Sequence, residues 1–517
     1  MNFTGRFPNT SRHRTLAWWL LLLAAKSVDI VRGSLYSFEV THRYSEKARK
    51  ELQERHGQAF QDWPQQGSPE FHDMLFFFDL RRHLGRIAAS KTPPLMASST
   101  GNTTYYNQYD GLQYTYIEIG TPSQAYFVAL DTGSDLLWLP CAHCVSCVAS
   151  VSTEFSSTYN VYDPAVSTTY KGVGCGSPYC DMARQCALGS TQCPYHLQYL
   201  SPASSEGYLV DDVIYLTPQN GGDKIAIAIV FGCGTNQTGA FLNGSTVPNG
   251  LLGLGMRGIS TPSILARAQV VANSFSMCFD YDVGTGRLVF GDRGSPHAES
   301  TPILTRLSPP YYWVSLTYVV VGGKHVLTPA VAIFDTGTTY TYLTTTYYNK
   351  VAAAFSPMPV QVDRAVPYQR MVSPVDAFDL CYALDIDKTS VELPAIALHF
   401  SGGAKLEVIR PYVLIGDSQD RILGFCLALM DSQSDYSIIG HNFMVNHSIT
   451  FDRVKNKITW IQVPCSASQH MRKGDSCGRQ TLLVFPFQYE MKIREGTGFT
   501  ASILVDKSIS KRSSFPH

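Results

Sequence analysis

AYFVALDTGSDLLWLPC at residues 125–141 and AVAIFDTGTTYTYL at residues 330–343 carry the same pattern. In each, an apolar run ends in Asp-Thr-Gly, with Asp131 in the first copy and Asp335 in the second. Glycine accepts backbone angles that other residues avoid, so a strand that ends in this way can hold its aspartate on a tight turn. The copies are about 200 residues apart, roughly one domain length. The repeat therefore predicts two similar lobes that each bring one carboxyl group to a shared site.

Two carboxyl groups at one site cannot both ionise easily, so they share a proton and supply one acid and one base. A single Asp-Thr-Gly is also good turn chemistry, but two copies after matching apolar runs favour catalysis. The residues that follow each aspartate, above all the hydroxyl residues, are expected to support its carboxylate. These supporting residues are Thr132, Gly133, Ser134, Thr336, Gly337 and Thr338.

A second repeat accompanies the first. Leu251-Leu252-Gly253 follows the first aspartate, and Ile438-Ile439-Gly440 follows the second. Either triplet alone reads as a buried strand, but their order predicts one strand threaded beneath each aspartate loop.

Composition and strand pattern limit the class of protein. With 517 residues the chain can form more than one lobe, and 41 basic against 41 acidic residues lack the basic footprint that nucleic-acid binding requires. From about Tyr105, short alternating or β-branched runs broken by Gly, Pro, Asn and Asp predict an all-β protein. Helices are expected near residues 263–269 and 344–355, and a hairpin turn near Lys455.

The N-terminal segment carries processing signals. Arg12, His13 and Arg14 precede the apolar run at residues 16–25, which is typical of a secretory signal peptide, although an uncleaved anchor is the alternative. The expected organisation is a signal peptide at 1–34, a propeptide or charged linker at 35–100, lobes at 101–305 and 306–465, and a disordered tail at 466–517. The polar C-terminal residues support no lipid anchor, and no stable membrane association is expected.

Thirteen cysteines behind a secretory signal favour disulfides, with one left over, for which Cys477 is the candidate. The C-x2-C-x2-C run of Cys141, Cys144 and Cys147 has zinc as its competing interpretation. Sequons predict surface glycosylation at Asn102, Asn236, Asn243 and Asn446.

Together, both aspartate motifs, both apolar-apolar-Gly triplets, WLPC at 138–141 and FGCG at 231–234 resemble the pepsin-like aspartic endopeptidases over about residues 105–465. The cysteine-rich insertion is similar to that of the plant nepenthesin-type and related atypical members. The resemblance implies an all-β, bilobal double β-barrel with an active-site cleft between the lobes. It also implies a flap hairpin in which Tyr199 lines the substrate pocket and bonds Trp138, although Leu200-Ser201-Pro202 departs from the common Tyr-Gly-Asp-Gly tip.

The resemblance also implies a disulfide pairing that the sequence alone leaves open. The implied pairs are Cys141–Cys144, Cys147–Cys233, Cys175–Cys193, Cys180–Cys186, Cys278–Cys465 and Cys381–Cys426.

The expected function is aspartic endopeptidase activity in acid, with water activated between Asp131 and Asp335 and no metal or cofactor. We expect the substrates to be polypeptides and the protein to be a monomer. Its expected location is extracellular (cell wall) or vacuolar. The alternative is a catalytically silent binding protein on the same fold, like the plant xylanase inhibitors and storage globulins, which typically lose one aspartate or its glycine. A zinc or redox protein built on the clustered cysteines is a third hypothesis.

Overall fold

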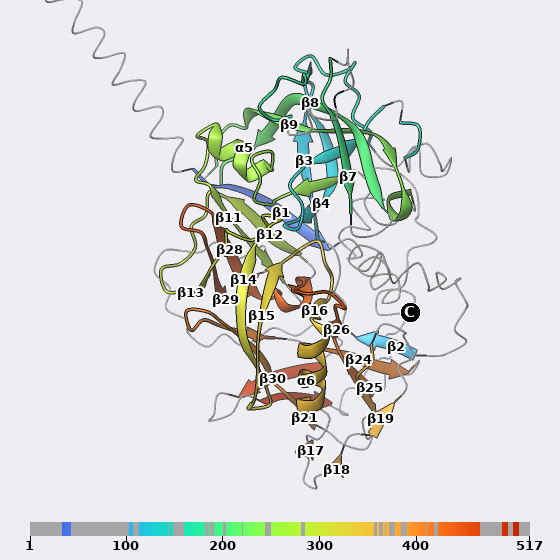
Figure 1. The fold of residues 1–517 in the computed structure, drawn as a ribbon, viewed down its shortest axis with the longest axis vertical. Coiled ribbons are helices and arrows are strands. Elements are labelled where there is room, and N and C mark those ends of the chain that lie inside the picture. The colour runs from blue at the N-terminus through green and yellow to red at the C-terminus, as the bar shows by residue number, and fades with distance from the viewer. Residues whose placement is uncertain are drawn as a thin grey trace, which may run out of the picture.

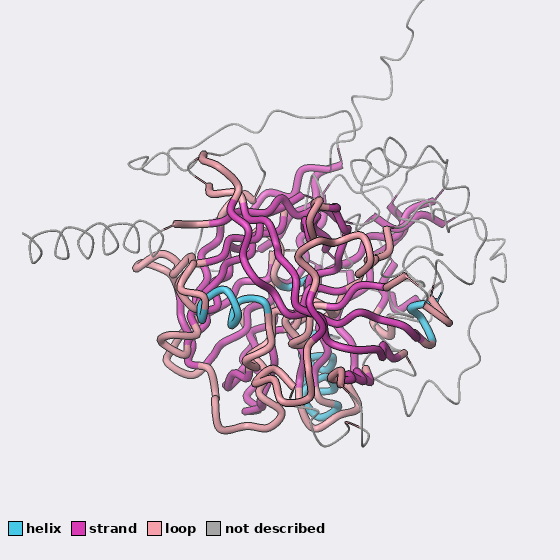
Figure 2. Tube along the Cα trace, turned by 90° about the horizontal axis from the view of Figure 1, so that it is seen from above, coloured by secondary structure: helices cyan, strands magenta, loops and turns pink. Residues whose placement is uncertain are grey.

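β-Strands make up most of the computed structural model (Figures 1 and 2), which describes residues 34–42, 103–106, 113–465 with gaps, 489–494 and 500–505. The gaps are residues 143, 148–159, 181–185, 187–190, 200–202, 220, 243–249, 281–284, 356–358, 361–365, 368, 372–377, 384–389, 410 and 418–421. The two lobes of the all-β fold expected from the sequence are present. The signal segment and Cys477 lie outside the described residues.

The largest sheet has 14 strands and joins the lobes. Its order is β13 (Glu299–Pro302), β29 (Lys457–Gln462), β28 (His447–Asp452), β11 (Ser274–Phe279), β12 (Thr285–Phe290), β1 (Tyr36–His42), β3 (Gln113–Ile119), β4 (Gln124–Asp131), β10 (Leu251–Gly253), β5 (Trp138–Pro140), β9 (Ile225–Gln237), β8 (Ser204–Leu216) and β6 (Lys171–Gly172), with β7 (Pro194–Gln198) also on β8. The hairpin expected near Lys455 joins β28 to β29.

The C-terminal lobe contains the other sheets. A seven-stranded sheet has the order β23 (Lys405–Val408), β22 (Ile396–Phe400), β14 (Trp313–Val321), β15 (Lys324–Phe334), β27 (Ser437–Ile439), β16 (Thr341–Leu343) and β26 (Leu429–Asp431). A five-stranded sheet has the order β19 (Gln369–Met371), β20 (Cys381–Ala383), β25 (Ile422–Leu427), β24 (Tyr412–Asp417) and β2 (Thr103–Tyr106), and β17 (Pro359–Val360) pairs with β18 (Val366–Pro367).

The helices in the described residues are short, and both expected ones are present. They are α5 (Thr261–Arg267) and α6 (Thr345–Phe355), with 3-10 turns η2 (Gly239–Leu242) and η3 (His441–Phe443). In α6, Tyr347, Tyr348, Val351 and Phe355 are buried at three- and four-residue spacing, which is the pattern of a helix with one apolar face.

Strand β1 comes from the segment expected to be a propeptide. It lies between β12 and β3, with Val40 opposite Gly286 on one side and Thr115 on the other. Tyr36 and Val40 are buried. These seven residues are therefore an internal strand of the central sheet in the full-length chain.

The C-terminal tail differs from expectation in two stretches. β30 (Tyr489–Arg494) and β31 (Thr500–Val505) form an antiparallel hairpin, and β31 pairs with β21 (Ser390–Pro394). These twelve residues of the tail, which was expected to be disordered, form paired strands, because backbone groups at the edge of β21 can pair with an added strand.

Two expected disulfides are present, Cys278–Cys465 and Cys381–Cys426, and the other four pairings were wrong. The structure instead contains Cys141–Cys233, Cys144–Cys147, Cys175–Cys186 and Cys180–Cys193 in place of Cys141–Cys144, Cys147–Cys233, Cys175–Cys193 and Cys180–Cys186.

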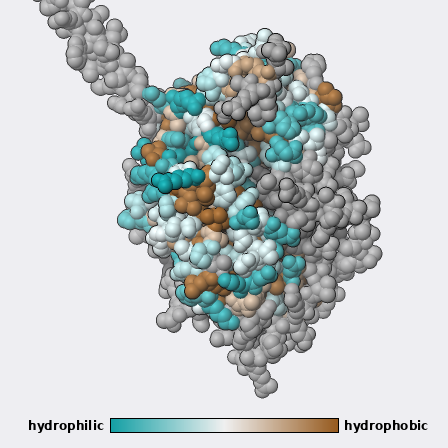
Figure 3. Space-filling model, viewed as in Figure 1, coloured by the Kyte–Doolittle hydropathy of each residue, from teal (hydrophilic) through white to brown (hydrophobic). Residues whose placement is uncertain are grey.

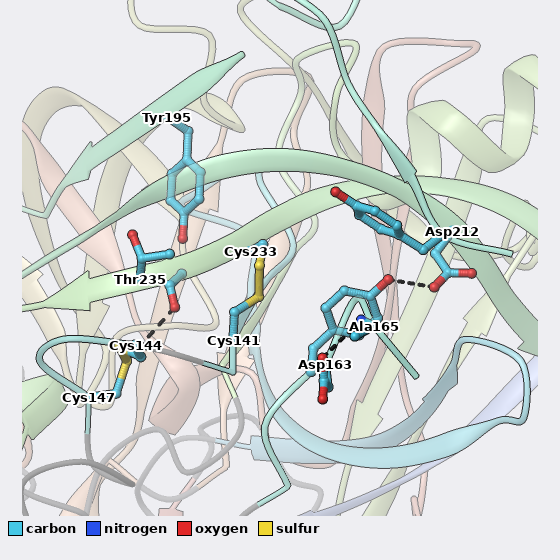
Figure 4. The surroundings of a disulfide bond; sticks show 12 residues. Cys141, Cys144, Cys147, Asp163, Ala165, Tyr195, Asp212, Cys233 and Thr235 are labelled. Carbon is cyan, nitrogen blue, oxygen red and sulfur yellow. Dashed lines mark hydrogen bonds between the residues drawn. A yellow bond between two sulfur atoms is a disulfide. The ribbon is translucent and has the colours of Figure 1, made fainter. Parts of the chain in front are cut away.

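The pairing of strands explains the first correction. β5 runs parallel to β9, and the Cys141 amide donates a hydrogen bond of 2.9 Å to the Gly234 carbonyl. This contact places Cys141 beside Cys233, as Figure 4 shows, and leaves Cys144 and Cys147 to pair within their loop.

On the face drawn in Figure 3, hydrophobic residues gather in separate places between hydrophilic ones. Within the described residues, no helix is long and apolar enough to cross a membrane.

Candidate active site

Asp131 is the last residue of β4 and is held from below by β10. These strands are parallel, with Leu252 opposite Leu130 and Gly253 opposite Asp131. The Leu254 amide donates a hydrogen bond of 2.8 Å to the Asp131 carbonyl. The strand expected beneath the first loop is therefore present.

The second loop has the same construction. β15 runs parallel to β27, with Ile333 opposite Ile438 and Phe334 opposite Ile439. The Asp335 amide donates a hydrogen bond of 3.1 Å to the Ile439 carbonyl. Because side chains alternate along strands with a period of two, matching registers place the two aspartates equivalently.

Each carboxylate accepts the same two kinds of hydrogen bond. The Gly133 amide donates to Asp131 Oδ1 at 2.9 Å, and the Ser134 hydroxyl donates to Asp131 Oδ2. These contacts fix the orientation of the first carboxyl group.

At the second carboxyl group, the Gly337 amide donates to Asp335 Oδ1 at 2.9 Å, and the Thr338 hydroxyl donates to Oδ2 at 2.7 Å. Gly133, Ser134, Gly337 and Thr338 thus contact the carboxyl groups that they were expected to support. Asp131 and Asp335 are 0% and 1% exposed, so both depend on these donors rather than on bulk water.

The two loops are bonded to each other through their threonines. The Thr132 amide donates to the Thr336 hydroxyl at 3.2 Å, and the Thr336 amide donates to the Thr132 hydroxyl at 3.0 Å. The hydroxyls donate onward to the carbonyls of Phe334, at 3.0 Å, and Leu130, at 3.3 Å. This reciprocal set relates the loops by an approximate twofold axis.

Gly133 shows how closely the loops approach. A Cβ atom placed on Gly133 would lie 2.7 Å from Asp335 Oδ1, closer than non-bonded atoms allow. The second carboxyl group therefore lies directly against the first loop.

The β7–β8 hairpin supplies the predicted flap contact. β7 pairs with β8 from Pro194–Tyr208 to Gln198–Ser204, and Tyr199 follows at the tip. The Trp138 indole N–H donates to the Tyr199 hydroxyl at 2.8 Å. This bond joins the hairpin to the strand that follows the Asp131 loop.

Phe241 completes this contact and was not found from the sequence. Its ring is 5.3 Å from that of Trp138 and 5.0 Å from that of Tyr199, with an edge-to-face arrangement in both cases. Such arrangements are favourable for aromatic rings. The residue follows a glycine-rich stretch without a regular pattern, so no periodic signal marks it.

A second aromatic group lies near the aspartates in the C-terminal lobe. Trp313 is 5.7 Å from Tyr311 and 5.1 Å from Tyr436 between ring centroids. Burial, followed by electrostatic interactions with Tyr436 and Asp335, raises the pKa of Tyr311 to about 12. The sequence pattern in this segment indicates only a strand, so it gives no sign of this aromatic group.

His441, in η3, lies directly behind the second loop. Its amide donates to the Thr338 carbonyl at 2.8 Å, and its ring is 4.6 Å from Phe279. Burial, with a smaller effect of His42, lowers its pKa to about 3. The side chain therefore remains neutral over most of the acidic range.

Two of the four sequons can be placed. Asn236 and Asn446 are half-buried, and Asn236 Nδ2 donates to Glu206 Oε1 at 2.5 Å. Asn102 and Asn243 lie outside the described residues. Within the described part of the chain, no group of three or more His, Cys, Asp or Glu residues is arranged to hold a metal ion.

A bilobal β-fold with an Asp-Thr-Gly loop from each lobe at one buried site defines the class of pepsin-like aspartyl proteases, and the chain belongs to this family. Two family profiles match, described as xylanase inhibitor N-terminal at residues 114–292 and xylanase inhibitor C-terminal at residues 311–461. The gap between them contains the expected lobe boundary near 305.

Plant proteins are among the relatives of this chain. The chain is 38% identical to Aspartyl protease family protein 1 of Arabidopsis thaliana, covering 87% of this chain and 86% of that protein. It is 33% identical to Aspartic proteinase-like protein 1 of Arabidopsis thaliana, covering 88% and 85%. It is 27% identical to Aspartic proteinase nepenthesin-2 of Nepenthes gracilis, covering 72% and 82%.

Solved structures of similar fold include basic 7S globulin from soybean, with a TM-score of 0.52, 18% identity, and coverage of 70% of this chain and 94% of that one. A second is EDGP, with a TM-score of 0.54, 18% identity, and coverage of 70% and 95%. At such identities the likeness concerns the fold alone. The relatives and the six disulfides are typical of a protein of the secretory pathway.

Proposed function

We propose that this chain is an aspartic endopeptidase that hydrolyses peptide bonds in acid. The observation that supports this most directly is the paired arrangement of Asp131 and Asp335, each with an amide donor on one oxygen and a hydroxyl donor on the other. Two carboxyl groups positioned alike at one site suit a reaction that needs an acid and a base together.

In the proposed reaction, a water molecule between the carboxyl groups gives one proton to the ionised aspartate and attacks the scissile carbonyl carbon. The protonated aspartate hydrogen-bonds the developing oxyanion. The amine product leaves with a proton from the site, which returns the pair to its starting state. The donors on each carboxylate keep both groups oriented throughout.

Tyr199, Trp138 and Phe241 would line the substrate side from the first lobe, and Tyr311 and Tyr436 from the second. These aromatic rings favour extended peptides with bulky apolar side chains near the cleaved bond. The same proposal includes that the protein is secreted, that it is glycosylated at the sequons, and that its N-terminal segment is removed. An extracellular or vacuolar location is its expected destination.

A silent binding protein is the alternative, because the matching family profiles are described as xylanase inhibitor domains. Both motifs keep their aspartate, glycine and hydroxyl residue in hydrogen-bonded positions, which supports the protease.

The test is cleavage of a denatured protein by purified full-length chain from about pH 3 to pH 7, before and after incubation in acid. Asp131→Asn and Asp335→Asn remove one carboxylate each with little change in shape. The exposed Asp223→Asn serves as the matched control. We expect acid activity that both active-site variants and pepstatin abolish and that the control retains. Wild-type protein inactive at every pH, despite correct folding, would overturn the protease proposal in favour of the binding protein.

A further inference from the structure

Asp135 follows Ser134 directly and places a third carboxyl group behind the Asp131 loop. The corresponding position after Thr338 is Thr339, a buried hydroxyl residue, so the two halves of the site differ here. The approximate symmetry of the hydrogen bonds around the two aspartates therefore does not extend to the charges behind them.

Arg257, in the turn after β10, binds this carboxylate twice. Its amide donates to Asp135 Oδ1 at 2.7 Å, and its guanidinium Nε lies 3.5 Å from Oδ2. The neighbouring Gly255 amide donates to the Ser134 carbonyl at 2.8 Å. A Cβ atom on Gly255 would lie 2.5 Å from Asp135 Oδ1, so the carboxylate fits tightly against this turn.

Arg453, after β28, holds the turn from the other side. Its guanidinium donates to the Met256 carbonyl and the Ser263 hydroxyl at 2.7 Å each, and to the Ser260 hydroxyl at 3.3 Å. In the described part of the chain, the charged and titratable groups that interact with Asp135 are Arg257, Arg453 and Asp131, with Tyr311 and Tyr312 just before β14.

On balance, the pKa of the Asp135 carboxyl is raised above its usual value. Burial raises the pKa of the Asp135 carboxyl, whereas the Arg257 amide, the charge of Arg257 and the charge of Arg453 act in the opposite direction. The charge of Asp131 acts with burial, so the two carboxyl groups interact.

We propose that Asp135 and Arg257 form a charge pair that sets the pH range in which Asp131 and Asp335 work, so that both are positioning residues for the reaction. This inference rests on the proposed protease function. A negative charge near the pair makes its ionisation harder, and a positive charge makes it easier.

Single substitutions should therefore shift the pH profile in opposite directions. Asp135→Asn keeps the Oδ1 acceptor for the Arg257 amide but removes the negative charge. The aspartate pair then ionises at lower pH, and the profile of kcat/KM should move down by about half a pH unit or more. Arg257→Gln removes the positive charge, and the profile should move up by a similar amount.

Two matched variants separate charge from shape. Arg257→Lys keeps the positive charge and should restore the wild-type profile. Glu118→Gln breaks an exposed ion pair with Lys224, whose atoms are 2.6 Å apart, and should leave the profile unchanged. A merely structural role for Asp135 and Arg257 would lower kcat in both variants without moving the profile in opposite senses.

The outcomes distinguish the two proposals. If wild-type protein is active and the Asp135 and Arg257 variants keep its pH profile, or shift it in the same direction, the charge-pair proposal is wrong while the protease remains. If wild-type protein has no activity, the protease proposal fails and this one fails with it.

Discussion

The hydroxyl of Thr132 accepts a hydrogen bond from the amide of Thr336, and the hydroxyl of Thr336 accepts one from the amide of Thr132. Both side chains are fully buried. Each threonine thus fixes the backbone of the opposite lobe next to the aspartate that performs the chemistry in our proposal.

Thr132→Val should therefore reduce activity, because it removes a hydrogen bond that holds the two aspartate loops together. The valine has nearly the same shape but leaves the Thr336 amide without its acceptor, which should cost about 1–3 kcal/mol of unfolding free energy. Displacement of the loops should lower kcat by about 10- to 100-fold. Thr132→Ser keeps the hydroxyl and should behave like wild type in both measurements. Equal activity of the valine and serine variants would show that the bond between the loops is dispensable.

Tyr199→Phe tests the hairpin contact. The substitution keeps the ring packed on Phe241 but removes the acceptor for the Trp138 indole. We expect a loss of about 0.5–1.5 kcal/mol in unfolding free energy and a rise in KM for peptide substrates. Tyr215→Phe, which removes a hydroxyl contact with Thr121 on the same lobe, should change stability but not KM. An unchanged KM in the Tyr199 variant would place this contact outside substrate binding.

His441 should make the protein less stable in acid. Its pKa of about 3 in the folded chain lies below the ordinary value of 6.5. Above pH 6.5 the ring is neutral in both states and has no effect. As the pH falls from 6.5 towards 3, His441 binds a proton in the unfolded chain but not in the folded chain. The free energy of unfolding therefore decreases, on the order of 3 kcal/mol by pH 4.

His441→Leu removes this proton uptake and should lose less stability than wild type between pH 7 and pH 4, as measured by urea unfolding. His297→Gln changes an exposed histidine and should follow the wild-type curve. A leucine variant with the wild-type dependence on pH would exclude His441 as a source of acid sensitivity.

Val40→Asp probes the N-terminal strand in the full-length protein. Val40 is 0% exposed and lies between β12 and β3, so a carboxylate there would be buried without a partner. We expect destabilisation by more than about 3 kcal/mol in thermal or urea unfolding. Glu39→Gln, at the exposed neighbouring position, should change stability by less than about 0.5 kcal/mol. Similar stability of the two variants would mean that β1 is not held in the central sheet.

The aspartate loops were predictable because their geometry is local. Apolar residues, aspartate, a small hydroxyl residue and glycine within one short run specify strand, turn and support for the carboxylate. The strand beneath each loop was predictable because its triplet repeats in the same order. The Trp138–Tyr199 bond came from the family resemblance and not from the local pattern.

Features that depend on pairing between distant segments were not predictable. Cys141 bonds Cys233 because β5 lies parallel to β9, and no spacing between cysteines reveals that register. Similarly, apolar and polar residues alternate too little in β1 to predict a strand with two partners. One of these partners, β12, lies about 250 residues away. The strands of the tail add to a sheet edge whose presence only the fold shows.

The position of β1 also orders events during synthesis. Tyr36 lies opposite Phe290. Strand β1 is therefore synthesised early, but it cannot pair with β12 until more than half of the chain has been synthesised. Contacts of such long sequence separation form slowly, and an unpaired strand is exposed to association with other chains in the meantime. Folding of this protein should therefore depend on chaperones that bind its N-terminal segment. Co-translational pulse labelling should find β1 accessible until residues 285–290 have emerged from the ribosome.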